Sequence, residues 1–158
     1  MSNADRLDSA NDYRAPVPVG ACGMAKAAQL LGDRWTLLIV REALYGVTRF
    51  DAMQADLGLP RSVLSNRLKR LVETGVLTMR TYREAGQRAR RQYVLTPMGV
   101  DLALPLIALM QWGDKHLCED SPSAEIIERR TGGRLHVGLV DDDGKSINLR
   151  DTQFRVVD

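Results

Sequence analysis

The sequence is poor in the residues and patterns that mark several large protein classes. Only two cysteines occur among 158 residues, so we do not expect a disulfide scaffold. The longest uncharged apolar run, residues 102–112, is too short to span a bilayer, and residues 1–18 lack the apolar stretch of a secretory signal. Phosphate-binding loops, nucleophile elbows and zinc-protease motifs are also missing. We therefore expect a cytoplasmic protein that is not an enzyme, uses no cofactor and does not bind a membrane.

Two weak metal-site patterns fail on spacing and on ligand count. Residues 141–144 resemble part of a calcium loop, but Arg150 then falls where a bidentate glutamate is required. His116 and Cys118 are close in sequence, yet the other histidine of the chain, His136, supplies no clear third ligand. The sequence therefore predicts no metal centre, and a hairpin turn explains residues 141–144 better.

The basic residues are distributed unevenly, although the formal net charge is only +2. From Arg61 to Tyr93 nine basic residues stand against two acidic ones, which gives this window a charge of +7. The remainder has 13 basic and 18 acidic residues, a charge of −5. A strongly basic third of a nearly neutral chain indicates a polyanionic partner.

The apolar periodicity predicts a mainly α-helical fold with a small β-hairpin, an α+β class. Asp33, a Thr48–Asp51 capping box, and Thr96 with Pro97 are the expected helix starts. A three-residue break at 58–60 between two of the helices has the form of a helix-turn-helix. The expected helices cover residues 22–31, 34–44, 49–57, 61–74 and 97–113, and the expected hairpin strands cover 76–82 and 91–95.

The helix over residues 61–74 is the first candidate for a nucleic-acid contact. Leu64, Leu68 and Leu71 share its apolar face, and the opposite face has groups that reach base edges and phosphates. A solvated face of an ordinary helix would look much the same, so both interpretations stay open at this point. The candidate contact residues are Arg61, Ser62, Ser65, Asn66, Lys69 and Arg70.

The hairpin that follows favours the nucleic-acid interpretation. Its tip and flanks are crowded with arginines, where a plain surface would mix charges of both signs. Arginine on an extended tip can enter a minor groove or contact phosphates beside a recognition helix. The candidate residues of the hairpin are Arg83, Arg88, Arg90 and Arg91.

The predicted last helix, residues 97–113, has almost no polar face, since Asp101 is its only charged residue. A helix of this kind must be buried on more than one side, which a small domain cannot achieve alone. We therefore expect it at the seam of a homodimer. The candidate seam residues are Leu102, Leu106, Leu109 and Trp112.

The order and spacing of these blocks resemble the HxlR family of winged helix-turn-helix regulators, within the MarR/ArsR-like superfamily. The resemblance covers about residues 22–117 and implies a dimeric DNA-binding protein, paired through its terminal helices, that regulates nearby genes. Pro60 stands where the family often has a capping serine, and residues 84–88 lack the prolines usual at the hairpin tip. The resemblance is carried by residues 22–25, 31–39, 49–50, 63–68, 71–76, 93–99 and 112–113.

The same resemblance gives Cys22 two interpretations. Some relatives of this type sense oxidants or electrophiles through a cysteine at this N-terminal position, and a thiol at a helix start is more reactive. The alternative is a small, buried packing residue, which is how free cysteine often occurs. An oxidant or a small molecule is therefore the class of effector to test.

Taken together, these features predict three segments and one leading function. Residues 1–20 form a flexible lead, 21–117 the DNA-binding and dimerisation domain, and 118–158 a linker with a small β-rich extension of three strands. The predicted function is sequence-specific binding of duplex DNA as a homodimeric repressor on an inverted-repeat operator. The alternatives are a winged-helix module for protein interaction and a small ligand-binding protein with an apolar pocket at the seam. The extension strands are expected at 135–140, 146–149 and 152–157.

Overall fold

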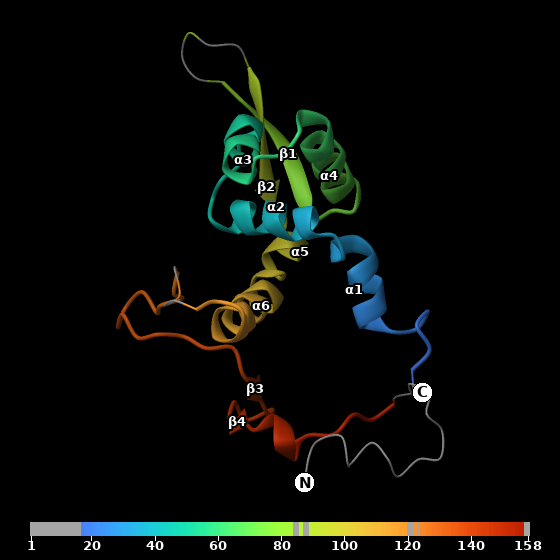
Figure 1. Cartoon of the computed structure of the whole chain (residues 1–158), viewed down its shortest axis with the longest axis vertical. Coiled ribbons are helices and arrows are strands. Elements are labelled where there is room, and N and C mark those ends of the chain that lie inside the picture. Colours follow the sequence, from blue (N-terminus) through green and yellow to red (C-terminus); the bar gives the residue numbers. More distant parts are fainter. Residues whose placement is uncertain (1–16, 84–85, 87–88, 120–121, 123, 157–158) are drawn as a thin grey trace.

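The structure is a computed structural model that describes residues 17–83, 86, 89–119, 122 and 124–156. In Figure 1, α3, α4 and the β1–β2 hairpin lie at one end of the molecule, and α1, α6 and the C-terminal segment make up the other end. We call the β1–β2 hairpin the wing and residues 122–156 the extension. The elements are α1 (Gly23–Leu31), α2 (Arg34–Leu44), α3 (Phe50–Leu57), α4 (Arg61–Glu73), β1 (Leu77–Tyr82), β2 (Arg90–Leu95), α5 (Pro97–Val100), α6 (Ala103–His116), β3 (Leu139–Val140), β4 (Ser146–Ile147) and the 3₁₀ turn η2 (Leu149–Asp151).

Local signals account for most of the helix ends. Asp33 caps α2 because its carboxylate accepts hydrogen bonds from the amides of Trp35 and Thr36, both at 3.1 Å. Gly58 follows α3 in the left-handed conformation, with φ +62°, and so ends the helix before the break of the helix-turn-helix. Thr96 caps α5 through the amide of Gly99, with Pro97 in the first turn.

The wing is a two-stranded antiparallel sheet in which Leu77 pairs with Leu95 and Tyr82 with Arg90. A single core lies beneath it, between α2, α3, α4 and the start of β1. This core fixes the orientation of α4 relative to the wing. Its fully buried side chains include Ile39, Val40, Met53, Leu64, Leu68, Leu71, Val76 and Leu77.

The expected capping box before α3 is wrong. Thr48 and Arg49 lie in extended conformation beside β2: the carbonyl of Thr48 accepts the amide of Tyr93 at 2.7 Å, and Arg49 forms an isolated bridge with Gln92. Arg49, not Thr48, occupies the N-cap position, and its side chain makes no capping hydrogen bond. The capping box does not form because Thr48 and Arg49 pair with β2 at the edge of the wing instead.

The expected single helix over 97–113 is instead two helices. α5 ends at Val100, and α6 begins at Ala103. Pro105 gives the physical reason: it has no N–H to donate to the carbonyl of Asp101, and its ring collides with that carbonyl in a continuous helix. Pro105 therefore lies in the first turn of α6, where the missing donor costs nothing.

The extension contains less strand than expected. The turn at Asp143 and Gly144 forms, with Gly144 at φ +79° and the Asp141 carboxylate accepting the amides of Asp143 and Lys145. Its strands β3 and β4 have two residues each, and the third expected strand, over 152–157, is absent from its described part, 152–156. Among the described residues, no helix is both long and apolar enough to cross a membrane.

Candidate nucleic-acid interface

The core holds α4 by one face and leaves the other open. Leu64, Leu68 and Leu71 are at most 1% exposed, whereas Ser62, Ser65, Asn66 and Lys69 lie on the exposed side. As expected from Pro60 at the N-cap position, α4 starts without a side-chain cap. The exposed polar side chains of α4 therefore begin in its first turn, with Ser62, and continue along the helix to Lys69.

A groove joins the start of α4 to the wing, and we call it the basic groove. Ser62 and Ser65 come from α4, and Arg90 and Arg91 come from β2 on the opposite wall. The structure thus brings together candidate residues that lie almost 30 positions apart in the chain. Its lining also includes Arg49, Phe50, Asp51, Ala52, Arg61, Tyr82, Ala89 and Tyr93.

Aromatic rings hold two arginines of the basic groove in place. The guanidinium carbon of Arg61 lies 4.6 Å from the ring centre of Phe50, and that of Arg49 lies 4.9 Å from the ring of Tyr82. Arg61 also forms an exposed ion pair with Asp51 at 3.3 Å. These contacts orient the positive groups along the groove instead of leaving them free to rotate.

Arg67 is basic but faces inward, toward the helix start at Asp33. Its Nε donates to the Asp33 carboxylate at 3.1 Å, and the Thr36 hydroxyl donates to the other oxygen of that carboxylate. Partial burial tends to raise the pKa of Asp33, but the hydrogen bonds from Thr36 and the charge of Arg67 outweigh it and hold the pKa below its ordinary value. Arg67 therefore ties α4 to α2 and contributes no free charge to the exposed face.

Two other candidates on α4 have partners within the chain. The Arg70 guanidinium donates to the backbone carbonyl of Gln29, so it reaches toward α1. Lys69 pairs with Glu73 at 3.7 Å, one helical turn along. Of the wing candidates, Arg83 is exposed at the end of β1. Arg88 lies outside the described residues.

The candidate seam residues divide into two pairs. Leu102 and Leu106 are half-buried against the core of their own chain. Leu109 and Trp112, farther along α6, are 49% and 53% exposed. Since α6 contains no buried residue, its outer half presents apolar surface to solvent in the single chain.

Cys22 stands at the N-cap position of α1 and is half-buried. It is thus neither fully packed in a core nor fully open to solvent. This placement leaves both interpretations of Cys22 open.

Sequence reasoning missed Arg49 and Tyr82 as members of the basic groove. The available signal was a basic residue directly before the first helix of the helix-turn-helix, but the sequence does not show that this segment runs beside β2. Tyr82 ends β1, and its sequence context indicates only a strand-forming residue. Both are recognisable only once the wing has folded back on α3.

Comparison with known proteins identifies a helix-turn-helix in the same part of the chain. The model of the HxlR-like helix-turn-helix family matches residues 30–121. Rv3095 of Mycobacterium tuberculosis, an uncharacterized HTH-type transcriptional regulator, is 46% identical over 94 residues, which cover 60% of this chain and 58% of the relative. The match thus spans little more than half the length of that relative.

Two solved structures also resemble this chain. The proposed transcription factor PA1607 is 32% identical, with a TM-score of 0.74 over 85% of this chain and 94% of its own. The reduced form of the transcriptional regulator YodB from B. subtilis is 27% identical, with a TM-score of 0.52 over 62% of this chain and 95% of its own. The PA1607 match covers 85% of this chain, which is more than residues 1–121 could supply. It therefore includes part of the extension.

The fold and the matches agree on the architecture. A helix-turn-helix formed by α3 and α4 is followed directly by a wing, and the family model covers more than half of the chain. The fold is a winged helix-turn-helix. The chain belongs to the HxlR-like helix-turn-helix family, in which the relatives above are described as transcriptional regulators.

Proposed function

We propose that this protein is a transcriptional regulator that binds duplex DNA sequence-specifically, as a homodimer and as a repressor. The observation that carries the proposal is the basic groove, in which the exposed start of α4 faces the arginines of β2. A recognition helix needs base-reading groups and phosphate-binding groups on one surface, and this groove supplies both.

The two walls of the groove have different tasks. On α4, Ser62, Ser65 and Asn66 are exposed polar groups able to hydrogen-bond to base edges in the major groove. Arg90 and Arg91 on the wing, with Arg61 at the helix start, are suited to the flanking phosphates. Lys69 and Arg70 complete the proposed contact set by exchanging their present partners, Glu73 and the Gln29 carbonyl, for phosphates.

The homodimer is supported by the exposed apolar side chains in the outer half of α6. Leu109 and Trp112 offer apolar surface that a second α6 covers, and residues 21–117 would then form the dimerisation and DNA-binding unit. Two-fold symmetry places the two α4 helices on an inverted-repeat operator, with half-sites about one helical turn apart or a multiple of it.

Selection of bound sequences from a random duplex pool tests the proposal directly. We expect an inverted repeat to emerge, and we expect Asn66→Ala to change the preferred bases within each half-site. Asn148→Ala, at the same residue type in the extension, is the matched control and should select the parent motif. Selection of no motif, or of the same motif by both variants, would overturn the assignment of α4.

A module for protein interaction without DNA binding is the second candidate. The positive charge of the basic groove favours a polyanionic partner over this alternative, because its lining has four arginines and one acidic residue, Asp51. Failure of the protein to retain any duplex at low salt would favour this alternative.

We further propose that Cys22 makes DNA binding responsive to oxidants. The support is mechanical: Cys22 is the N-cap residue of α1, and the Gln29 carbonyl of α1 accepts a hydrogen bond from Arg70 of α4. A change at the start of α1 can therefore reach the recognition helix. Diamide treatment should lower operator affinity of the parent and leave Cys22→Ser unaffected, with Cys118→Ser as the control cysteine. An equal response of parent and Cys22→Ser would contradict the proposal.

A further inference from the structure

The basic groove contains an acidic side chain, although its proposed ligand is a polyanion. Among the described residues that line the groove, Asp51 is the only acidic one. A carboxylate beside phosphates lowers the affinity for a duplex of any sequence. The capping box that would have used this carboxylate does not form, because Arg49 and not Thr48 is the N-cap residue of α3. Helix capping therefore does not account for Asp51.

The Asp51 carboxylate is bonded to Arg61 at the start of α4. Nη1 of Arg61 donates to Oδ1 of Asp51 at 3.3 Å, and the guanidinium carbon lies 4.6 Å from the ring centre of Phe50. Phe50 and Asp51 are consecutive residues in the first turn of α3, so adjacent side chains restrain the guanidinium together. Among the described residues, Asp51 is its only hydrogen-bond partner, which leaves its other N–H groups available to a phosphate.

The ion pair is open to water in the single chain. The side chain of Arg61 is 71% exposed and that of Asp51 is 78% exposed. A pair of this kind contributes little to the stability of a fold, because water screens it. A duplex in the groove displaces that water, and the same pair then acts in a lower dielectric, where charges interact more strongly. Asp51 therefore restrains Arg61 most when DNA is bound.

The direction of Arg61 matters because phosphate contacts fix the register of a protein on a duplex. An arginine that rotates freely can pair with phosphates in many registers, whereas a restrained one meets a phosphate in few of them. A fixed register keeps Ser62 and Ser65, which line the same groove, opposite the same base edges. A side chain that is already restrained also loses less conformational freedom on binding.

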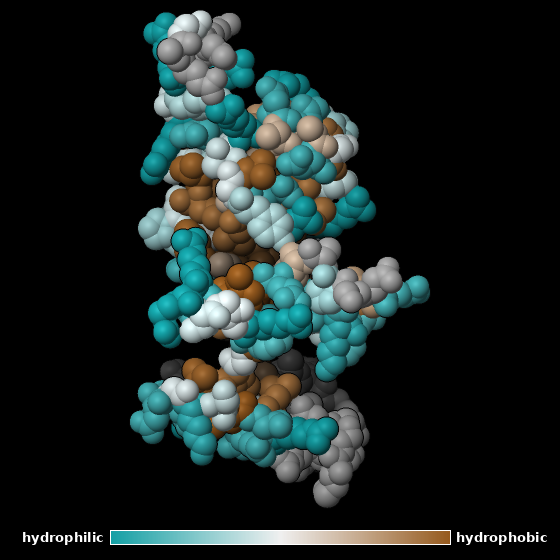
Figure 2. Space-filling model, turned by 90° about the vertical axis from the view of Figure 1, so that its left-hand side faces the viewer, coloured by the Kyte–Doolittle hydropathy of each residue, from teal (hydrophilic) through white to brown (hydrophobic). Residues whose placement is uncertain are grey.

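Polar groups dominate the surface at this end of the molecule. On the face drawn in Figure 2, the surface around the wing is hydrophilic, whereas apolar surface gathers over the middle of the molecule and the extension. Electrostatic interactions between exposed groups depend on each charge and on the salt concentration. The removal of one charge from the basic groove is therefore measurable as a change in affinity for DNA.

We propose that Asp51 is a positioning residue for DNA binding, which holds the Arg61 guanidinium beside Phe50 in one direction. It lowers the affinity for duplexes of any sequence and raises the preference for the operator over them. This inference rests on the proposed sequence-specific DNA binding and names a further residue that sets its specificity.

The test compares the affinities for two duplexes of equal length. One contains the sequence that the parent selects from a random pool, and the other contains the same half-sites scrambled. Asp51→Asn should bind the scrambled duplex more tightly, about twofold or more, because a repelling charge is gone. The ratio of the selected to the scrambled affinity should fall about fivefold or more, because Arg61 loses its fixed direction.

This ratio separates positioning from a structural role of Asp51. An acidic residue in the first turn of a helix also stabilises that helix. Partial unfolding of Asp51→Asn would lower both affinities alike and leave the ratio unchanged. A ratio within about twofold of the parent value would therefore overturn the proposal.

The same change in an Arg61→Ala background shows whether Asp51 acts through Arg61. There, Asp51→Asn should change the ratio by less than about twofold, because the side chain that it positions is absent. An equal fall of the ratio in both backgrounds would show that Asp51 acts by another route and would contradict the inference.

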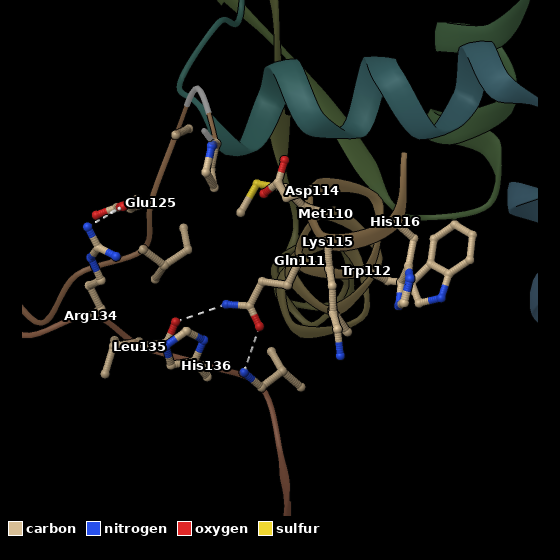
Figure 3. A pocket seen from close by; sticks show the side chains of 15 residues that line it. Met110, Gln111, Trp112, Asp114, Lys115, His116, Glu125, Arg134, Leu135 and His136 are labelled. Atoms are coloured by element: carbon tan, nitrogen blue, oxygen red, sulfur yellow. Dashed lines mark hydrogen bonds and ion pairs between the residues drawn. The ribbon is translucent and has the colours of Figure 1, made fainter. Parts of the chain in front are cut away.

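Two control variants match Asp51→Asn in chemistry. Asp56→Asn removes an exposed acid of α3 outside the groove lining. Glu125→Gln breaks the 2.9 Å ion pair with Arg134 beside the hollow between α6 and the extension (Figure 3). Both should keep the parent ratio within about twofold, and a fall in either as large as that of Asp51→Asn would sink the proposal. A parent that binds both duplexes equally would instead remove the proposed sequence-specific function.

Discussion

At the scale of single residues, Asp33 is the point where α2 and α4 are linked. Its carboxylate caps α2, accepts the Thr36 hydroxyl and pairs with Arg67 of α4 at 3.1 Å. A sequence pattern could predict the cap, because the cap is local. It could not predict Arg67, which lies 34 positions away, so a residue counted as surface charge is a structural link between α2 and α4.

Asp33→Ala should lower the free energy of unfolding by about 1–2 kcal/mol, since it removes a helix cap and leaves Arg67 without its partner. Urea titration followed by circular dichroism measures this decrease. Asp56→Ala, on the exposed side of α3, is the control and should change stability by no more than about 0.5 kcal/mol. Equal decreases for the two variants would contradict the role assigned to Asp33.

The lowered pKa of Asp33 also predicts a pH dependence. A carboxyl whose pKa is lower in the folded than in the unfolded state stabilises the fold while it is ionised, and loses that effect as the pH falls through the folded pKa. Asp33→Asn keeps a capping side chain but removes the charge. The stability advantage of the parent over this variant should therefore be present at pH 7 and shrink below about pH 4, near the ordinary carboxyl value. An advantage that is unchanged at pH 3 would argue against the Arg67 link.

At the scale of elements, the junction between the core and α5 depends on one close approach. A Cβ added at Gly99 would lie 2.2 Å from the carbonyl oxygen of Val76 and 2.9 Å from Cδ2 of Leu95. Gly99→Ala should therefore destabilise the protein by about 1–3 kcal/mol, because backbone cannot move aside cheaply. Gly23→Ala at the start of α1, where nothing lies within 4 Å, should stay within about 0.5 kcal/mol. Thermal unfolding of both variants compares them, and similar midpoints would refute the packing argument.

The elements also show where sequence reasoning succeeds and where it stops. The α4 helix follows from its hydrophobic periodicity, because its apolar face covers the core. The wing strands follow from their β-branched and aromatic residues instead, since burial does not alternate along either strand. The break before α6 follows from Pro105 only if one considers which carbonyl its ring would meet, and the pattern of apolar residues hides it. Thr48 fails as a cap because pairing with β2 takes the segment, a contact that no local signal announces. The sequence predicts too much strand in the extension, since β-branched residues alone do not supply a partner strand.

At the scale of the whole molecule, the described structure has two chemically different ends. The basic groove lies at the end with α3, α4 and the wing, and the apolar surfaces of α6 and the extension lie at the other (Figure 1). This separation allows a protein to pair with a second copy while its charged surface stays open. Of the nine basic residues in the charged window, Arg61, Arg90 and Arg91 line the groove together with Arg49, which lies outside that window.

The salt dependence of duplex binding tests the central claim, that the basic groove is the DNA-binding surface, most directly. The logarithm of the binding constant should fall linearly with the logarithm of the salt concentration, and Arg90→Ala should make this slope shallower by about one unit for each phosphate that the arginine neutralises. Arg129→Ala, at an exposed arginine of the extension, should leave the slope unchanged. The account predicts a shallower slope for Arg90→Ala alone; identical slopes for Arg90→Ala and the parent, or no duplex binding at low salt, would contradict it.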